Sequence, residues 1–312
     1  MNGVLIIDKP TGLTSHDVVN RVRRILQERS IGHLGTLDPM ATGVLPLVAG
    51  NLTRLAQFYT HSEKGYEGTI RFGFATDTYD AEGEPTTEPK EVALRPEEVE
   101  SAAARFRGMI EQTPPPFSAK KIKGIPAYKL ARKHQEVTLK PVQVEIKEFE
   151  ILSVDFDRVR FRARVASGTY MRCVAHEMGN ALSCGAHLES LRRTAVAEFT
   201  LEDAHTLDAL AGAAGKTSPG NLSTSPAANE GPGERTPEIL DAFFIHPRKL
   251  LPQFPAVTAD EITTAHIRSG RTVNLPELSR TRQIKVFSGQ RDLIAIATRI
   301  AGTLFHPKIV LC

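Results

Sequence analysis

A stretch of low complexity divides the chain into two unequal parts, and this feature constrains the fold more than any other. From Gly212 to Pro237 the residues are mostly Gly, Ala, Ser, Pro, Thr and Asn, without apolar periodicity. Such a segment buries too little apolar surface to offset its conformational entropy, so we expect an exposed, flexible insertion. It separates residues 1–211 from a connecting segment at 238–254 and a small module at 255–312, and the length suggests about two domains.

The composition is that of a globular protein with a sizeable core. Hydrophobic residues make up 41% and charged residues 24% of the 312 positions, which excludes a wholly disordered chain. No apolar run approaches the roughly 18 residues of a membrane span, and the first residues lack the features of a secretory signal. We therefore expect a soluble, cytoplasmic protein. The three cysteines include no CxxC pair, which supports neither a disulfide framework nor a thiolate zinc site.

Apolar periodicity predicts a mixture of strands and helices. A helix is expected after Ser15, which can act as its N-cap, and a second helix after the Gly168-Thr169 turn. In the module that follows residue 255, a short helix is expected at residues 259–268. Strands are predicted at residues 3–8, 66–74, 142–154, 159–165, 283–286, 293–300 and 309–311.

The formal net charge of +3 hides a strong segregation of charge along the chain. Residues 77–100 contain nine acidic and two basic side chains, whereas residues 120–133 contain no acidic side chain and six basic ones: Lys120, Lys121, Lys123, Lys129, Arg132 and Lys133. A charge run is commonly a solvated helix face. Basic residues interleaved with aromatics such as Phe117 and Tyr128 also favour contact with RNA, so both interpretations stay open here.

Several familiar motifs fail on inspection. Residues 176–180 read HEMGN, whose last position is Asn and not the second histidine of a zinc helix, so we expect no metal site. Residues 215–217 read GKT, but Leu210 stands where the first glycine of a phosphate-binding loop belongs. The sequence contains neither a GxGxxG dinucleotide fingerprint nor a GxSxG nucleophile elbow.

Three short stretches hold the residues best suited to chemistry. The first is a glycine-punctuated loop at residues 32–43, which reads GHLGTLDPMATG and places Asp38 among apolar neighbours. Such a carboxylate is partly desolvated, which destabilises its charge, and a guanidinium such as Arg172 would restore the ionised form. An ionised, poorly hydrated carboxylate with a fixed partner is a usable nucleophile. The other two stretches are residues 64–66, with Tyr66, and residues 168–172, with Arg172.

Each of these residues also has an ordinary structural interpretation. Asp38 fits an Asp-Pro turn, Arg172 a surface cation of a helix, and Tyr66 a core position of a strand. Spacing along the chain does not show whether the three side chains converge, so the residues alone leave both interpretations open.

The loop at residues 32–43 resembles the active-site motif of the TruB-type tRNA pseudouridine synthases. Supporting blocks follow in the family's order and read DKPTGLTS (8–15), TDTYDAEG (76–83), PPFSAK (115–120), GTYMR (168–172) and GAHLESLRR (185–193). The resemblance covers the chain from its start to about Thr200. Residues 255–311 are similar, more weakly, to the PUA-like RNA-binding module that ends bacterial members. Departures are small, since Leu34, Thr36 and Met40 vary within the loop and Phe117 stands where a tyrosine is common.

The resemblance implies isomerisation of uridine 55, in the T-loop of tRNA, to pseudouridine without a cofactor or a metal. It assigns Asp38 as the nucleophile, attacking either the uracil ring or the anomeric carbon of the ribose. Arg172 would pair with Asp38 and hold it ionised. Tyr66 would stack on the target base, near the proton that leaves ring carbon 5.

The same resemblance implies a set of residues that bind the substrate. Tyr170 and Leu191 would line the pocket, and His33 would help to displace neighbouring T-loop bases as the uridine is extruded. A base inside a folded T-loop must be flipped at a cost of roughly a few kcal/mol, which aromatic stacking and phosphate contacts offset. Basic residues expected to contact the substrate are Lys9, Lys120, Lys121 and Lys123.

The implied fold is a mixed α+β pseudouridine synthase core with a largely antiparallel central sheet and the active cleft across its middle. The core would occupy residues 1–211, with an RNA-binding insertion at about 105–141, and a small β-rich, PUA-like RNA-binding domain would occupy residues 255–312. The expected partner is tRNA, bound at the T-stem-loop with acceptor-side contacts from the C-terminal module. We expect no membrane association and no obligatory protein partner, and we expect a monomer.

Other classes of function remain compatible with the sequence. One is a non-catalytic tRNA-binding or folding protein whose Asp38 loop is structural. Another is a guide-dependent pseudouridine synthase, which shares the catalytic motif. A methyltransferase is less compatible, because the chain has no glycine-rich cofactor loop.

Overall fold

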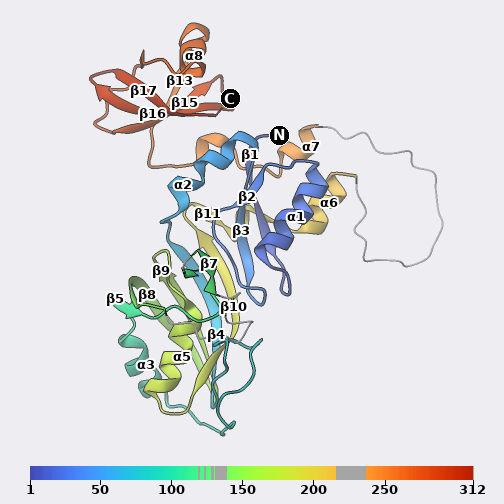
Figure 1. Ribbon diagram of the computed structural model, residues 1–312, viewed down its shortest axis with the longest axis vertical. Helices are drawn as coiled ribbons and strands as arrows, with labels where there is room; N and C mark the ends of the chain where they lie inside the picture. The colour runs from blue at the N-terminus through green and yellow to red at the C-terminus, as the bar shows by residue number, and fades with distance from the viewer. Residues whose placement is uncertain (119, 123, 128–129, 131–138, 216–236, 312) are drawn as a thin grey trace, which may run out of the picture.

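Two β-sheets organise most of the molecule (Figure 1), of which the computed structural model describes residues 1–118, 120–122, 124–127, 130, 139–215 and 237–311. Within these residues the larger sheet has ten strands. Its order is β12 (Ala204–His205), β1 (Gly3–Lys9), β3 (Thr42–Ala49), β10 (Ala186–Val196), β4 (Lys64–Phe72), β9 (Arg158–Val165), β8 (Val142–Asp155) and β5 (Gly108–Gln112), while β2 (Ile31–His33) pairs with β3 and β11 (Phe199–Thr200) with β10.

The sheet is largely antiparallel, as predicted. The pairs β1–β12 and β3–β10 are parallel, and the other paired strands run antiparallel. The strands β8 and β9, both predicted, form a hairpin, and Phe156 turns the chain between them with a φ of 49°. The expected fold class, a mixed α+β core followed by a small β-rich C-terminal module, is confirmed.

Helices cover one face of the larger sheet. They are α1 (Ser15–Leu26), α3 (Pro96–Ala104), α5 (Met171–Ala181) and α6 (Leu207–Ala213). Their apolar side chains share one core with alternate residues of the strands, among them Leu5 and Ile7 of β1. Val4 and Ile6 of the same strand belong to a second core on the opposite face, so β1 is buried on both sides and reads as a continuous apolar run.

The second core joins the larger sheet to the C-terminal module. It includes residues of the short helix α2 (Ala56–Tyr59) and of the preceding 3-10 turn η1 (Gly50–Leu55), together with Leu250, Phe287 and Ile309. The module itself consists of β13 (Ala256–Ala259), α8 (Glu261–Arg268), β14 (Val273–Asn274), β15 (Gln283–Ser288), β16 (Asp292–Ala301) and β17 (Leu304–Val310), with sheet order β13-β15-β16-β17-β14. Figure 1 shows it at one end of the molecule, beside α2.

Short elements complete the described chain. A two-stranded hairpin of β6 (Lys121–Ile122) and β7 (Ile125–Pro126) lies in the expected RNA-binding insertion. The remaining elements are the 3-10 turns η2 (Leu201–Asp203) and η3 (Pro247–Lys249) and the helix α7 (Pro237–Asp241). Among the residues described, no helix is long and apolar enough to cross a membrane.

Two sequence expectations need correction. The N-cap of α1 is Thr14 and not Ser15, because the Thr14 hydroxyl accepts from the Asp17 backbone N–H at 3.1 Å and the Asp17 carboxylate accepts from the Thr14 N–H at 3.0 Å. The helix α6 extends to Ala213, since its buried Leu210 and Ala211 pack into the core, so the low-complexity segment begins with helix. Residues 216–236 of the expected flexible insertion lie outside the described residues.

Candidate active site

The Asp38 loop connects β2 to β3 and lies against the N-terminal end of α1. The Ser15 hydroxyl accepts a hydrogen bond from the Leu37 N–H at 2.8 Å and donates one to the Leu37 carbonyl at 3.2 Å. The Ala41 N–H donates to the Asp38 carbonyl at 3.1 Å. Because Leu37 and Ala41 are buried in the main core, the loop is anchored on both sides of Asp38, whose own side chain keeps 34% of its surface exposed.

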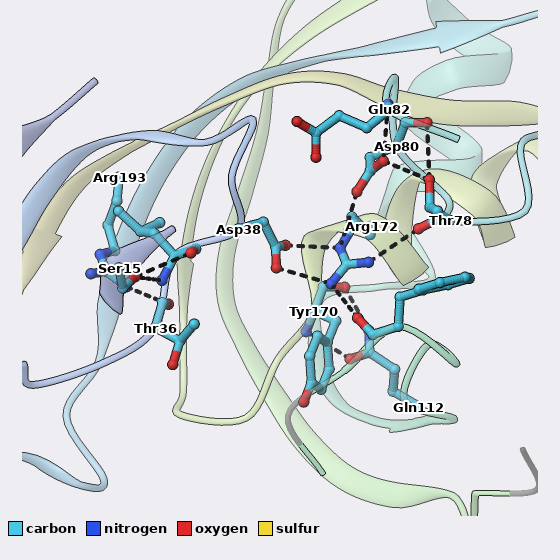
Figure 2. Close-up of polar contacts among 12 residues, drawn as sticks. Ser15, Thr36, Asp38, Thr78, Asp80, Glu82, Gln112, Tyr170, Arg172 and Arg193 are labelled. Atoms are coloured by element: carbon cyan, nitrogen blue, oxygen red, sulfur yellow. Dashed lines mark hydrogen bonds and ion pairs between the residues drawn. The ribbon is translucent and has the colours of Figure 1, made fainter. Parts of the chain in front are cut away.

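Arg172, the second residue of α5, points its guanidinium at the Asp38 carboxylate (Figure 2). Its Nη2 donates to Asp38 Oδ1 at 3.1 Å, and its Nε lies 2.8 Å from Asp38 Oδ2. The same guanidinium donates to the carbonyls of Thr78 at 3.1 Å and Phe117 at 3.0 Å. The Arg172 side chain is only 5% exposed, so it is a buried cation held in one orientation and not a surface residue of the helix.

Two further carboxylates stand on the other side of Arg172. Asp80 is buried, and its Oδ2 lies 3.6 Å from Arg172 Nε. Its Oδ1 accepts from the Thr78 hydroxyl at 2.6 Å and from the Glu82 N–H at 3.1 Å. Burial raises the pKa of the Glu82 carboxyl, and the nearby Asp80 and Asp38 carboxylates add to that shift. The buried Arg172 guanidinium therefore contacts two carboxylates, those of Asp38 and Asp80.

Arg193 fixes the other side of the Asp38 loop. It has no exposed surface, and its guanidinium donates to the carbonyls of Val44 at 2.8 Å, Thr36 at 3.1 Å and Gly35 at 3.0 Å. Tyr66 is the cross-strand neighbour of Arg193, is 8% exposed and belongs to the main core. Burial lowers the pKa of Arg193, and the Tyr66 hydroxyl, by hydrogen bonding, opposes that shift.

Lys9 is buried against the backbone of the Asp38 loop, at Pro39. The side chain is fully buried, and its ammonium donates to the carbonyls of Pro10 at 2.9 Å, Leu13 at 2.6 Å and Pro39 at 3.1 Å. Burial lowers the pKa of Lys9 to about 8. This placement contradicts the expected contact of Lys9 with the substrate, because every proton of the ammonium is already directed at a backbone oxygen. Lys9 instead holds the residue that follows Asp38.

The other expected substrate contacts are Tyr170, His33 and Leu191, none of which hydrogen-bonds to Asp38 in the described structure. Tyr170 is the N-cap residue of α5, and its backbone exchanges two hydrogen bonds with the Gln112 amide, at 2.8 and 3.1 Å. Burial raises the pKa of Tyr170. His33, in β2, accepts from the Gly35 N–H at 3.3 Å through Nδ1, and burial lowers its pKa. Leu191 is 8% exposed and belongs to the same core as Tyr66.

The other basic residues expected to contact the substrate, Lys120, Lys121 and Lys123, follow Phe117 in the sequence. Phe117 is bound to Arg172 through its carbonyl, and Lys120, three residues later, is exposed. The backbone of Lys121 opens the β6–β7 hairpin, whereas Lys123 lies outside the described residues, as do Tyr128, Lys129, Arg132 and Lys133. The described part of the basic stretch thus begins beside the Asp38–Arg172 pair.

Sequence reasoning missed three residues that build the site. Asp80 and Arg193 lie inside the blocks at 76–83 and 185–193, but nothing in their residue types gave them a role. Ser15 was interpreted as a cap, although it clamps the Asp38 loop. A buried arginine with backbone carbonyl partners leaves no sequence signal beyond a charge in an otherwise apolar alternation. In the part of the chain that the structure describes, no group of three or more His, Cys, Asp or Glu side chains could hold a metal ion.

The geometry supports nucleophilic chemistry at Asp38. Its carboxylate is partly exposed, is paired with a buried guanidinium and lies on a loop fixed by Ser15, Lys9 and Arg193. A carboxylate that is fixed in position and still partly exposed can reach and attack an electrophilic carbon.

Solved structures with the same fold place the chain in a class. A chain in the crystal structure of a Cbf5-Nop10-Gar1 complex matches 96% of this chain and 79% of its own length, at a TM-score of 0.66 and 24% identity. A structure of an H/ACA RNP bound to a substrate RNA containing 2'-deoxyuridine matches over 99% of this chain and 85% of that one, at a TM-score of 0.67 and 21% identity. The fold is that of the pseudouridine synthases.

Sequence comparisons identify the family within that class. The family model for the N-terminal domain of TruB family pseudouridylate synthases matches residues 23–171, and that for the tRNA pseudouridylate synthase B C-terminal domain matches residues 172–222. A tRNA pseudouridine synthase B of Solibacter usitatus is 47% identical over 314 residues, covering 100% of both chains. One of Opitutus terrae is 48% identical over 210 residues, 67% of this chain and 87% of that one. The chain belongs to the TruB family and is an isomerase that converts uridine in tRNA to pseudouridine.

Proposed function

We propose that this enzyme isomerises uridine 55 in the T-loop of tRNA and that Asp38 is its nucleophile. The observation that carries the proposal is the two-point contact between the partly exposed Asp38 carboxylate and the buried Arg172 guanidinium. Arg172 contacts both carboxylate oxygens of Asp38 and points them in a fixed direction. Asp38 attacks either the uracil ring or the anomeric carbon of the ribose, and the bond between ring nitrogen 1 and the ribose breaks. The base rotates, a bond forms between ring carbon 5 and the anomeric carbon, and the bond to Asp38 breaks, which releases the carboxylate. Ring carbon 5 loses a proton and ring nitrogen 1 gains one, so the product is an isomer of the substrate.

Four neighbouring side chains hold the flipped base. Tyr66 stacks on the uracil next to the proton that leaves ring carbon 5, while Tyr170 and Leu191 line the pocket. His33 displaces the adjacent T-loop bases. These roles are supported by the burial of Tyr66 and Leu191 and the half-burial of Tyr170 and His33, since an extruded base exchanges its stacking in the RNA for contacts with the protein.

Asp38→Asn is the direct test, with Asp8→Asn as its matched control. Asp8 also makes a two-point contact with an arginine, Arg192, at 3.0 and 2.8 Å, and its side chain is 30% exposed. We expect Asp38→Asn to abolish pseudouridine formation on unmodified tRNA while tRNA binding stays intact, and Asp8→Asn to remain active. Pseudouridine formation by Asp38→Asn would refute the nucleophile, and activity at a uridine other than 55 would refute the site.

The basic stretch that leaves the site is proposed to bind the tRNA backbone, and the C-terminal module to contact the acceptor side. The module has eight basic and four acidic residues after residue 255, which suits a polyanion. Replacing Lys120, Lys121 and Lys123 with Ala should weaken tRNA binding and flatten its dependence on salt. An unchanged slope of log Kd against log salt concentration would exclude this stretch from the interface.

We further propose that the enzyme acts as a monomer without a guide RNA or a protein partner. The alternative is an enzyme that needs partners, because one solved structure of similar fold is a Cbf5-Nop10-Gar1 complex. Purified enzyme should modify a bare tRNA transcript and elute as a monomer in gel filtration. Activity that appears only after an accessory protein or RNA is added would support the guide-dependent alternative.

A further inference from the structure

The turn that contacts Arg172 contains a residue in an unfavourable backbone conformation. Tyr79 has a φ of 65°, in the left-handed region that favours glycine, and it lies between two groups that face Arg172. The preceding residue, Thr78, offers its carbonyl to Arg172 Nη1 at 3.1 Å, and the following one, Asp80, places its carboxylate 3.6 Å from Arg172 Nε. Such a conformation persists only where the surrounding structure enforces it.

One contact that enforces it comes from α5 itself. The Tyr79 ring stacks on the His176 ring, with the ring centres 3.9 Å apart and the planes 16° from parallel. His176 follows Arg172 by four residues, so both side chains project from the same face of the helix. The helix therefore holds the turn at two points, the Thr78 carbonyl through Arg172 and the Tyr79 ring through His176.

The sheet fixes the backbone of the same turn. The Tyr79 carbonyl accepts from the Leu188 N–H at 3.0 Å, and the Ala81 N–H donates to the Leu188 carbonyl at 3.0 Å. These bonds locate the turn along β10, but the stack with His176 is the contact that the Tyr79 side chain makes with α5.

His176 interacts here as an aromatic ring and not as a polar group. Its Nδ1 is buried without a hydrogen-bond partner, and burial lowers its pKa while the neighbouring Glu177 opposes that shift. In the failed metal motif at residues 176–180, the imidazole thus presents its flat face to Tyr79.

We propose that the Tyr79–His176 stack is a positioning device for Arg172, which holds the strained turn so that the Thr78 carbonyl and Asp80 orient the guanidinium toward Asp38. This inference rests on the proposed role of Asp38. If the stack is lost, Tyr79 can relax, the Thr78 carbonyl moves, and Arg172 loses a fixed acceptor. A small displacement of a catalytic group lowers the rate of the chemical step more than it lowers binding.

The test compares two replacements of similar volume in the full-length enzyme. His176→Phe keeps a flat ring for Tyr79 to stack on, whereas His176→Leu fills the space without one. We expect His176→Leu to lower kcat about tenfold with KM for tRNA nearly unchanged, and His176→Phe to stay within about twofold of the wild type. Equal activity of the two variants, or a change confined to KM, would overturn the proposal.

A double-mutant cycle separates positioning from general loss of structure. If His176 acts through Arg172, His176→Leu should add little to the loss caused by Arg172→Lys, whereas independent effects would multiply. Multiplying losses would overturn the proposal.

NMR of the Arg172 Nε–H gives a readout that does not depend on catalysis. Its resonance should shift in His176→Leu and stay near the wild-type position in His176→Phe. If the resonance shifts as expected but Asp38→Asn remains active, the role of Asp38 as nucleophile is refuted and the positioning of Arg172 by the stack is not. An unmoved resonance in both variants would refute the device alone.

Discussion

The arginines on the exposed face of the sheet differ from those buried around Asp38. Strand β9 exposes every second residue, and its Arg158, Arg162 and Arg164 side chains are 45%, 56% and 49% exposed and pair with glutamates of other strands in the same sheet. Arg172 of α5 is 5% exposed, and Arg193 of β10 has no exposed surface. The outer arginines have carboxylate partners, whereas the inner ones also bind backbone carbonyls, two at Arg172 and three at Arg193.

The difference shows which charges determine the shape of the site. An exposed ion pair exchanges contact with water for contact with a carboxylate, and its net contribution is small. A buried guanidinium cannot leave without exposing several carbonyls to an apolar environment, so it fixes the loops that it binds. The Asp38 loop is thus held by cations that never meet solvent.

Arg193→Met should produce the largest loss of stability. It removes the donors of three backbone carbonyls, and we expect the free energy of unfolding to fall by about 3 kcal/mol. Arg192→Met is the matched control, because Arg192 directly precedes Arg193 in β10, is 42% exposed and pairs with Asp8. Its loss should stay below about 1 kcal/mol. Urea unfolding measures both, and equal losses would remove the distinction between the two faces.

Lys9→Met should have the next largest effect. Three carbonyls lose their donor, and we expect a loss of about 2 kcal/mol at pH 7 together with lower activity, because Pro39 adjoins Asp38. The pKa of Lys9 is lowered from 10.5 to about 8 by folding, so between these values the unfolded chain binds more protons and the wild type gains stability as pH rises.

The pH dependence sharpens that prediction. The difference in free energy of unfolding between the wild type and Lys9→Met should grow from pH 8 to pH 10.5, because the variant lacks this titration. A difference that stays constant over this window would show that Lys9 is not desolvated in the folded state.

Glu82→Gln should have a smaller effect of the opposite sign. Folding raises the pKa of Glu82, so the ionised side chain costs stability above that pKa, and the cost disappears as the pH falls through the folded pKa toward the unfolded value. The variant should be more stable than the wild type at pH 7, by less than about 1 kcal/mol, and the gain should vanish near pH 4.5. Glu84→Gln, in the same loop and exposed like Glu82, serves as control and should change the stability little.

The same contrast explains how much of the fold the sequence predicts. Strands β1, β8 and β9, helix α5 and the module strands β15, β16 and β17 were predicted at least in part, because their apolar residues follow a clear period, whereas the short β13 and β14 were not. Strand β10 was not, since bulges after Leu188 and Arg193 interrupt its alternation and a buried arginine occupies a core position. Helix α3, rich in Glu and Ala, has too few large apolar residues to show a helical period.

The site was predictable in chemistry but not in geometry. The residues alone left Asp38 open between a turn and a nucleophile, and the resemblance to the family was what assigned Asp38 and Arg172 as partners. That these residues meet, with Asp80 behind them, depends on a turn placed beside β10 by backbone bonds to Leu188. Lys9 was predicted to contact the substrate from its place in a family motif, but the structure buries its side chain. Backbone carbonyls, the partners of these cations, carry no sequence signal.

The Arg162–Glu67 pair should give the smallest effect and the clearest contrast. Its side chains are 56% and 38% exposed and approach to 2.9 Å. A double-mutant cycle with Arg162→Met and Glu67→Gln should yield a coupling below about 0.5 kcal/mol at low salt. Because the Debye length falls to about 3 Å at 1 M salt, this coupling should vanish there. The loss in Arg193→Met should persist in 1 M salt, since its hydrogen bonds to carbonyls are shielded from ions by the protein. A coupling at Arg162 that survives high salt would mean that the outer face is organised in the same way as the site.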